Sequence, residues 1–533
     1  MKRNFVISIF IILASINVKG QDKLQVNGSL MLNTGLYQYD SSLNTTNSQY
    51  LHQLSSAEAW FTINANYDGF YTTVRYDLFE NSQLINPNED YTAQGLNFFS
   101  VTKSIGNFTF TGGNFYDQIG SGILFRAYEE RTLGLDYAMQ GIRIIYKLND
   151  STSVKVFGGN QKNRFAVTPQ FIRCAEIDHL WGIGKVGFNT GAGFMNRTLD
   201  DATVQQLITD INNLPLSARF NPVYNVYAGT FYNTAIWKNF NWYVEGAAKS
   251  KEAVFITNPT TDSGELVNKN GYVIYSALGY SRSGLGINLQ YRKIDNFILR
   301  VNPYDNLLVG VMDYLPALSK QDAYRLPARY SISALPQGES AYQGEITYSF
   351  DTKNNINFNT SQVFDPTGNL LFREYYADYT KKFNPAVKMV TGLNSVIYDQ
   401  SVYESEPTDP TVHTITPFTE WTIRLGKSLR KSIQFEAQYL FTRQDVGDFA
   451  YLEAEYDLAP KFTFTLLDMY NDRPVLPNAP KLHYPGIFTS YTVNQTVISI
   501  GYTKQPEGII CTGGICRVEP AFSGLKATLN TNF

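Results

Sequence analysis

Residues 57–78 read AEAWFTINANYDGFYTTVRYDL, two alternating segments joined by Asp68-Gly69. Odd-numbered positions from 57 to 67 are apolar or aromatic, while even-numbered positions, apart from Trp60, are polar. After the turn the apolar set continues at even-numbered positions up to Leu78. Because successive side chains of a strand point to opposite faces, each segment predicts a β-strand with one apolar face. The Asp-Gly pair between them predicts a hairpin.

The same alternation recurs along the whole chain, for example at residues 285–292 and 432–441. We count about 22 such segments, mostly about 8–12 residues long, close to the length that a tilted strand needs to cross a bilayer. Short turns, such as the one at 351–354, alternate with longer irregular stretches. The sequence therefore predicts an all-β protein: one transmembrane antiparallel β-barrel of about 22 strands (an even number between about 16 and 24) with long extracellular loops.

Composition fits this architecture but also fits a soluble all-β protein such as a sandwich or a propeller. Aromatic residues make up 14% and charged residues only 17% of the 533 residues, whereas soluble domains usually carry about 25% charged residues. Strands of a soluble sandwich are usually shorter, about five or six residues. Beyond the N-terminus no run of eighteen apolar residues occurs, which excludes membrane-spanning helices. Strand length therefore favours the barrel.

The N-terminus has the pattern of an export signal. Lys2 and Arg3 precede an apolar run from Phe5 to Ile16, and small residues lead to Gly20. We expect residues 1–20 to be a cleaved signal peptide and residues 21–533 to form the barrel. No basic run that could neutralise phosphates follows, which argues against nucleic acid as a partner.

The last strand carries the clearest single signal. In residues 522–533 an alternating face ends in the terminal Phe533. We interpret Phe533 as a membrane-insertion signal that the barrel-assembly machinery reads, and we expect the protein in the outer membrane of a Gram-negative bacterium, in contact with its lipids. A further envelope protein or a second copy of the chain is an expected partner.

Two connections stand out. Asp200 or Asp201 can cap a short helix with apolar residues at Val204, Leu207, Ile208 and Ile211, which Pro215 would stop. This helix is expected on a loop. Residues 301–341 form a long stretch with four prolines, and loops of that length are usually functional or mobile.

Three motifs resemble an uncharacterised family of porin-like outer-membrane barrels of Bacteroidota. They are GSGILFRAYEER at 120–131, DYLPAL at 313–318 and CTGGICR at 511–517. The likeness runs over most of the exported chain. It implies a porin-like fold and an outer-membrane location, but no substrate.

Cys511 and Cys516 enclose Thr-Gly-Gly-Ile. An extracellular position and a glycine-rich tip favour a disulfide that holds a surface hairpin. A metal site would need further ligands, and no other His or Cys is near in sequence. Cys174 is left as a buried or loop thiol.

The densest cluster of charges consists of Arg126, Glu129, Glu130, Arg131 and Asp136. One interpretation is a segment folded into the lumen, where opposed charges act at a constriction; the other is an ordinary ion-paired network of a loop or the wall. Arg325 and Arg329 in the long loop could face this cluster or be solvated.

No enzyme motif, cofactor site or metal site is recognisable. The four histidines form no HExxH and stand near no nucleophile motif.

Alternation begins at Leu24, so an energy-coupled receptor with a plug domain before its first strand is disfavoured. The first hypothesis is a passive channel for small hydrophilic solutes. The second is a structural or assembly subunit whose lumen is closed by its own loops, with an outer-membrane enzyme a distant third.

Overall fold

The computed structural model describes residues 24–43, 49–84, 90–257, 264–306, 308–404, 411–476, 478–512 and 515–533, with the backbone alone for residues 257, 509–512 and 515–516. The expected signal peptide at residues 1–20 lies outside the described residues. Among those described, no helix is long and apolar enough to cross a bilayer.

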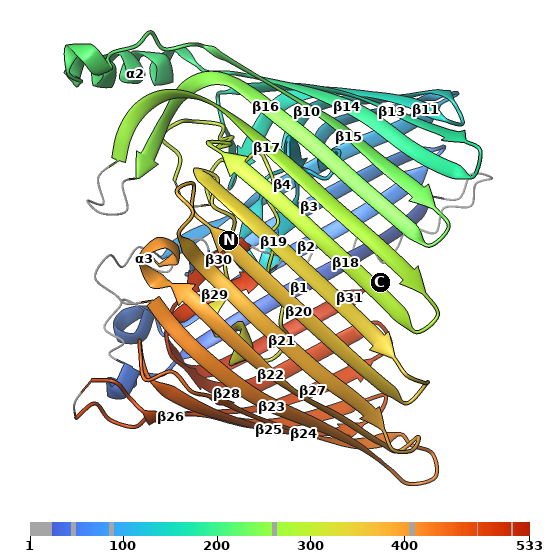
Figure 1. Cartoon of the computed structure of the whole chain (residues 1–533), viewed down its shortest axis with the longest axis vertical. Helices are drawn as coiled ribbons and strands as arrows, with labels where there is room; N and C mark the ends of the chain where they lie inside the picture. The colour runs from blue at the N-terminus through green and yellow to red at the C-terminus, as the bar shows by residue number, and fades with distance from the viewer. Residues whose placement is uncertain are drawn as a thin grey trace, which may run out of the picture.

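The described chain folds into a closed antiparallel β-barrel (Figure 1). Its sheet of 25 strands includes the two-residue β12 (Ala166–Val167), a side pairing on β11, so the wall itself has 24 strands. Each wall strand pairs with its neighbours in chain order, and β31 closes the ring by pairing with both β28 and β1. The predicted all-β barrel is therefore confirmed, with 24 strands in place of about 22.

The wall strands have the following bounds: β1 Gln25–Tyr37, β2 Ser55–Tyr67, β3 Phe70–Ser82, β4 Tyr91–Ile105, β5 Phe108–Phe115, β10 Met139–Asn149, β11 Thr152–Asn163, β13 Phe171–Ile183, β14 Val186–Thr198, β15 Asn225–Trp237, β16 Phe240–Thr257, β17 Gly264–Arg282, β18 Leu285–Asp295, β19 Gly338–Ser349, β20 Asn354–Phe364, β21 Leu370–Lys382, β22 Val387–Asp399, β23 Thr411–Leu425, β24 Lys431–Leu440, β25 Asp448–Leu458, β26 Phe462–Arg473, β27 His483–Val493, β28 Thr496–Gln505 and β31 Phe522–Asn532.

Connections differ sharply between the two ends of the barrel. At one end, on the right in Figure 1, the strands are joined by tight turns, and the two ends of the barrel chain meet there in the pairing of β1 with β31. Asp68 and Gly69 at one such turn both have positive φ, 49° and 68°, as a type I′ hairpin turn requires. All long connections are at the opposite end.

The outer surface of the wall is apolar. Leu525 and Phe533 of the last strand are 44% and 58% exposed, and Ala527 and Leu529 between them on the outward face are half-buried. Aromatic side chains cluster at strand ends beside the tight turns, namely Tyr67, Phe70, Phe108, Trp237, Phe240 and Tyr348. An apolar band bordered by aromatic residues is the outer surface expected of a barrel that meets lipid.

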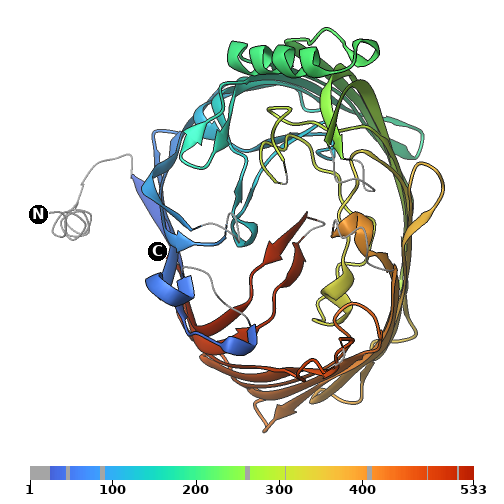
Figure 2. The same ribbon diagram turned by 90° about the vertical axis from the view of Figure 1, so that its left-hand side faces the viewer.

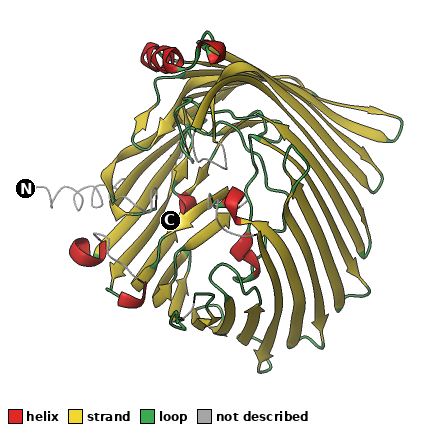
Figure 3. Cartoon of the chain, turned by 60° about the vertical axis from the view of Figure 1, so that its left-hand side comes forward, coloured by secondary structure: helices red, strands yellow, loops and turns green. Residues whose placement is uncertain are grey.

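Among the residues that the structure describes, helices are few and short (Figure 3). They are α2 (Asp201–Asn213), α3 (Gln400–Tyr403), η1 (Ser41–Leu43), η2 (Gln49–Gln53), η3 (Arg131–Leu133), η4 (Leu216–Ala218) and η5 (Pro327–Tyr330). The predicted loop helix is confirmed as α2, where the Asp200 side chain accepts a hydrogen bond from Thr203 N. Val204, Leu207 and Ile211 pack on the β16–β17 hairpin, which extends beyond the rim of the ring (Figure 1).

Candidate functional site

Two long connections fold into the barrel (Figure 2). We call residues 116–138, between β5 and β10, the first inserted segment; it contains β6 (Asp117–Ile119), β7 (Phe125–Ala127), β8 (Glu129–Glu130), η3 and β9 (Leu135–Asp136). We call residues 296–337, between β18 and β19, the second inserted segment; it contains η5. In the same view the hairpin of β29 (Gly508–Thr512) and β30 (Ile515–Glu519) lies within the outline of the ring, and β29 lies against η5.

The tip of the first inserted segment is fully buried against the wall. Ile119, Ile123, Leu124 and Phe125 are 0% exposed. They pack on apolar side chains from the inner faces of β11 to β18, which we call the packed arc: Phe157, Ile172, Cys174, Met195, Ala228, Ala247, Val273 and Ile294. This part of the lumen is thus a hydrophobic core rather than a water-filled space.

Two wall carboxylates fix the turn at the tip. Glu176 on β13 accepts a hydrogen bond from Gly120 N at 2.8 Å, and Glu245 on β16 accepts from Ser121 N at 3.2 Å and from the Ser121 hydroxyl. Gly120 has φ 55°, and a Cβ there would lie 2.8 Å from Glu245 Oε1. The glycine is needed both for its left-handed backbone and for this close approach.

The two inserted segments also hold each other. Tyr314 N donates to Gly122 O at 3.0 Å, and Arg126 N donates to Met312 O at 2.8 Å. Two of the three motifs that carry the family resemblance, residues 120–131 and 313–318, are therefore neighbours in space.

Wall side chains bind the backbone of the second inserted segment along its length. Arg292 donates to Pro316 O while it pairs with Glu339, and both charged side chains are 0% exposed. Lys249 donates to Ile298 O at 2.7 Å, and Gln438 accepts from Leu326 N at 2.7 Å. Since most of the side chains that anchor the second inserted segment are buried, the segment is a fixed part of the lumen.

Asp313 is a buried carboxyl group in the second inserted segment. Burial raises the pKa of Asp313 to about 7, although the positive charges of Arg300 and Lys249 oppose the shift.

Arg75 on β3 is the centre of the charged network near the first inserted segment. It binds Asp77 at 2.8 Å, Glu129 at 2.6 Å and Asp136 at 2.6 Å. Lys162 on β11 reaches Asp136 at 2.5 Å. The charges of this cluster are thus paired with one another over short distances.

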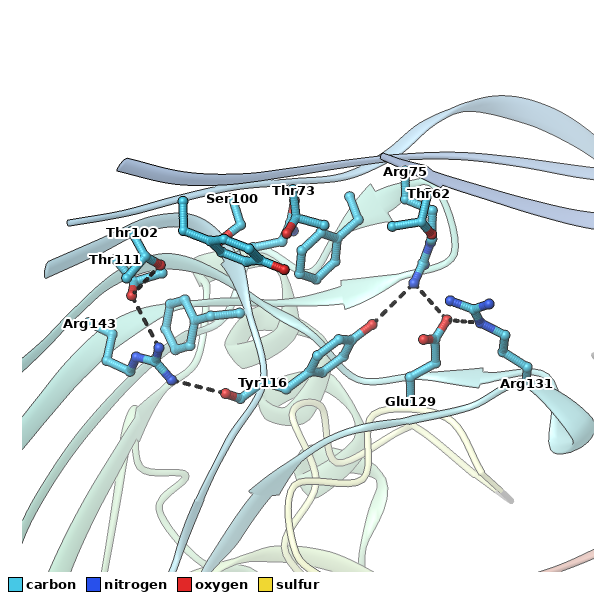
Figure 4. Close-up of a pocket in the computed structure, with 14 residues that line it drawn as sticks. Thr62, Thr73, Arg75, Ser100, Thr102, Thr111, Tyr116, Glu129, Arg131 and Arg143 are labelled. Atoms are coloured by element: carbon cyan, nitrogen blue, oxygen red, sulfur yellow. Dashed lines mark hydrogen bonds and ion pairs between the residues drawn. The ribbon is translucent and has the colours of Figure 1, made fainter. Parts of the chain in front are cut away.

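A cavity of about 570 Å³ lies between this network and the inner faces of β2 to β5 (Figure 4). Its wall side is lined mainly by hydroxyl and amide side chains, which we call the hydroxyl arc: Thr62, Thr73, Ser100, Thr102, Thr111 and Asn114. Tyr71, Phe98, Phe115 and Tyr116 add aromatic rings. Arg75, Glu129, Arg131 and Arg143 supply the charged lining.

The residues of the predicted charge cluster have separate local roles. Glu129 binds both Arg75 and Arg131, at 2.6 Å and 3.0 Å. Glu130 instead caps η3 by accepting from Thr132 N. The Arg126 guanidinium lies over the rings of Tyr128 and Tyr314, 4.6 Å and 4.1 Å from the centroids. Glu129 and Arg131 line the cavity; that any of these residues acts as a constriction stays a prediction.

The two arginines of the long loop lie apart from that cluster. Arg329 is 3.6 Å from Asp445 in the β24–β25 connection and lies over the ring of Phe449. Arg325 is exposed. Neither forms an ion pair with residues 126–136 among the contacts of the described residues.

The remaining sequence predictions are placed as follows. Cys511 and Cys516 are directly opposite in the β29–β30 register, but their side chains lie outside the described residues, so the disulfide stays a prediction. We expected this hairpin on the surface of the protein, but it lies within the ring of strands (Figure 2).

Cys174 is a buried thiol. Phe533 stacks on Phe61, and its N and O atoms bond to Gly28.

Sequence reasoning missed the wall residues that hold the inserted segments. Arg75, Glu176, Glu245 and Arg292 stand on the polar faces of strands, where a charge is expected to face water. Within one strand nothing distinguishes a charge that meets water from one that meets a folded loop.

The fold and this lumen define the class: a large β-barrel of the kind found in Gram-negative outer-membrane proteins. The chain belongs to a family of unknown function (DUF6029), whose model matches residues 1–533. A search of the curated proteins finds no match.

Solved barrels resemble the chain in outline. The P pilus usher (PapC) translocation pore is 10% identical, with coverage of 96% of this chain and 99% of that one and a TM-score of 0.47. The ferric citrate transporter FecA is 11% identical, with coverage of 96% and 79% and a TM-score of 0.41. OprB of Pseudomonas putida is 10% identical, with coverage of 70% and 93% and a TM-score of 0.34. Similarity of this degree says nothing of what the protein transports or binds.

Proposed function

We propose that the protein is a passive channel in the outer membrane of a Gram-negative bacterium, through which small hydrophilic solutes cross beside the inserted segments. A barrel of 24 strands is wide enough to enclose an aqueous path unless something fills it. The first inserted segment fills the side of the packed arc, and the second also packs on the inner faces of β19 to β27, while the hydroxyl arc is left facing a cavity. That cavity, with hydroxyl and amide side chains along its wall side, is the observation that carries the proposal.

The proposed partners follow from the outer face of the barrel and from its last strand. Outer-membrane lipids would cover the apolar outer face, and the barrel-assembly machinery would insert the chain by its last strand. On the resemblance of the three motifs, we propose a bacterium of the Bacteroidota as the source.

Planar bilayers test the proposal directly. The purified full chain is expected to give discrete conductance steps. Glu245→Leu, which removes the acceptor for Ser121 N, is expected to loosen the first inserted segment and to make the current larger or noisier. Glu345→Leu is the matched control, because Glu345 lies on β19 away from that segment. A folded, inserted barrel without any conductance would overturn the channel.

The second candidate is a structural or assembly subunit with a closed lumen. It is favoured by the two apolar clusters that seal the inserted segments against the wall, one on the packed arc and one around Leu318, Leu326 and Tyr330. It predicts a silent barrel that is isolated in mild detergent with an envelope protein or a second copy of the chain at fixed stoichiometry.

A further inference from the structure

The cavity beside the hydroxyl arc has the chemistry of a ligand site as well as of a path. Its volume of about 570 Å³ lies within the range of about 300–1,000 Å³ that is usual for sites of small organic ligands. Its lining comes from five strands and from the first inserted segment. Both the wall and the anchored segment are fixed, so the cavity is preformed.

The hydroxyl groups are arranged in cross-strand rows. Tyr71, Thr102, Thr111 and Arg143 follow one another directly across β3, β4, β5 and β10. Within this row the Thr102 and Thr111 hydroxyls are 3.0 Å apart, and Arg143 donates to Thr111 Oγ1 at 3.1 Å (Figure 4). Thr73 and Ser100 form the next row. The Thr73 hydroxyl donates to Asn64 Oδ1 at 2.8 Å and keeps its acceptor lone pairs for a bound group. Because each hydroxyl of a polyol can donate as well as accept, such rows match a solute that carries several hydroxyl groups.

Aromatic rings stand beside these rows. Tyr71 is 46% exposed at the end of the cavity near the tight turns. Phe98 and Tyr116 are stacked at 5.3 Å deeper in the cavity. The electron-rich face of a ring attracts the weakly positive C–H groups on the apolar side of a sugar ring.

The charges that line the cavity are already neutralised. Arg75 has Glu129 and Asp136 at 2.6 Å, Arg131 has Glu129 at 3.0 Å, and Arg143 has Asp117 at 3.0 Å. An anionic solute would have to displace these carboxylates, whereas a neutral polar solute can bond to the paired groups as they stand. The cavity therefore favours uncharged solutes over anions.

We infer that the cavity between the hydroxyl arc and the first inserted segment is a binding site for neutral polyhydroxylated solutes, the saccharide class. The inference deepens the proposed channel and rests on it: the site would lie on the permeation path and retain saccharides briefly as they cross.

Maltotriose is the probe, with succinate and arginine as anionic and cationic solutes. Isothermal titration of the detergent-solubilised full chain is expected to show maltotriose binding and weaker or no binding of the charged probes. In planar bilayers maltotriose is expected to interrupt the ion current.

The variants Thr73→Val and Ser100→Ala each remove one hydroxyl, and each is expected to weaken maltotriose binding about fivefold, the value of one hydrogen bond. Thr347→Val is the matched control, since Thr347 bonds to Asn357 Oδ1 on the distant β19–β20 wall and its loss should leave maltotriose affinity unchanged.

Failure of the inference and failure of the channel are distinguishable. Ion current without maltotriose binding, or tighter binding of succinate, overturns the saccharide site and leaves the channel standing. Maltotriose binding that the hydroxyl variants weaken, in a barrel without current, supports the site and overturns the channel.

Discussion

The hydroxyl arc and the packed arc are two parts of one wall with opposite inner surfaces. On β2 to β5 the inward side chains are largely Thr, Ser and Asn, and they face a cavity. On β11 to β18 the inward side chains toward the loop end include Phe157, Met195 and Ile294, and they bury the first inserted segment. The outward side chains of both arcs are apolar.

The difference shows that the inner face of a wide barrel is patterned by what lies against it. Where a segment folds in, the wall supplies apolar contacts and a few buried charges for backbone groups, because unpaired polar groups at such a contact are costly. On the hydroxyl arc, where a cavity separates the wall from the first inserted segment, the inward side chains are mainly hydroxyl and amide groups. Four tests address this contrast.

The largest effect is expected at the buried ion pair that holds the second inserted segment. Arg292→Met leaves Glu339 buried without its charge partner and is expected to lower the free energy of unfolding by about 3–5 kcal/mol, measured by urea unfolding in detergent. The double variant with Glu339→Leu should recover most of the loss. Lys103→Met on β4, whose partner Asp68 is 69% exposed, should cost less than about 1 kcal/mol. Equal losses in both single variants would contradict the contrast.

A second test concerns Gly193 on β14, which lies close to Ile119 of the first inserted segment. A Cβ on Gly193 would lie 2.2 Å from Ile119 Cγ2, so Gly193→Val should cost about 1–3 kcal/mol through overpacking and expose the first inserted segment to limited proteolysis. Gly187 on the same strand has no atom within 4 Å of an added Cβ. Gly187→Val should therefore be harmless, and proteolysis of both variants at the same rate would show that the segment is not packed there.

The third test concerns pH. Burial raises the pKa of Asp313 to about 7, against an ordinary value of 3.8. The folded protein thus holds a proton that the unfolded chain releases, and stability falls as pH rises through this window. Between about pH 5.5 and pH 8 the contribution of this group to the loss is about 2 kcal/mol, and Asp313→Asn should remove that contribution. An unchanged pH dependence in this variant would mean that Asp313 is not the titrating group.

The smallest effect is expected at the hairpin tip. If Cys511 and Cys516 form a disulfide, the intact protein should be lighter than the reduced protein by two hydrogens in mass spectrometry, while Cys174 stays reduced. Removal of the disulfide by Cys511→Ser with Cys516→Ser should cost less than about 2 kcal/mol, because the closed loop is short. Alkylation of both Cys511 and Cys516 in protein purified without a reducing agent would refute the disulfide.

The sequence by itself determined the barrel. Alternation at residues 57–78 predicted β2, β3 and their turn, and the pattern of Val204, Leu207 and Ile211 predicted α2. These features depend on neighbours in the chain, and local periodicity is enough to reveal them. The strand count was about two too low; alternation is weakest where inward positions are apolar as well, as at Ile172 and Cys174 of β13.

Only the tertiary structure decided what the lumen contains. The sequence showed that residues 126–136 are rich in charge. It did not show that Arg75 on β3, more than fifty positions earlier, would bind Glu129 and Asp136. It carried the motifs at 120–131 and 313–318 without showing that they touch. The physical reason is that a strand's inward face has the same local pattern whether it meets water or a folded segment, and the difference arises only when residues distant in sequence meet inside the closed ring.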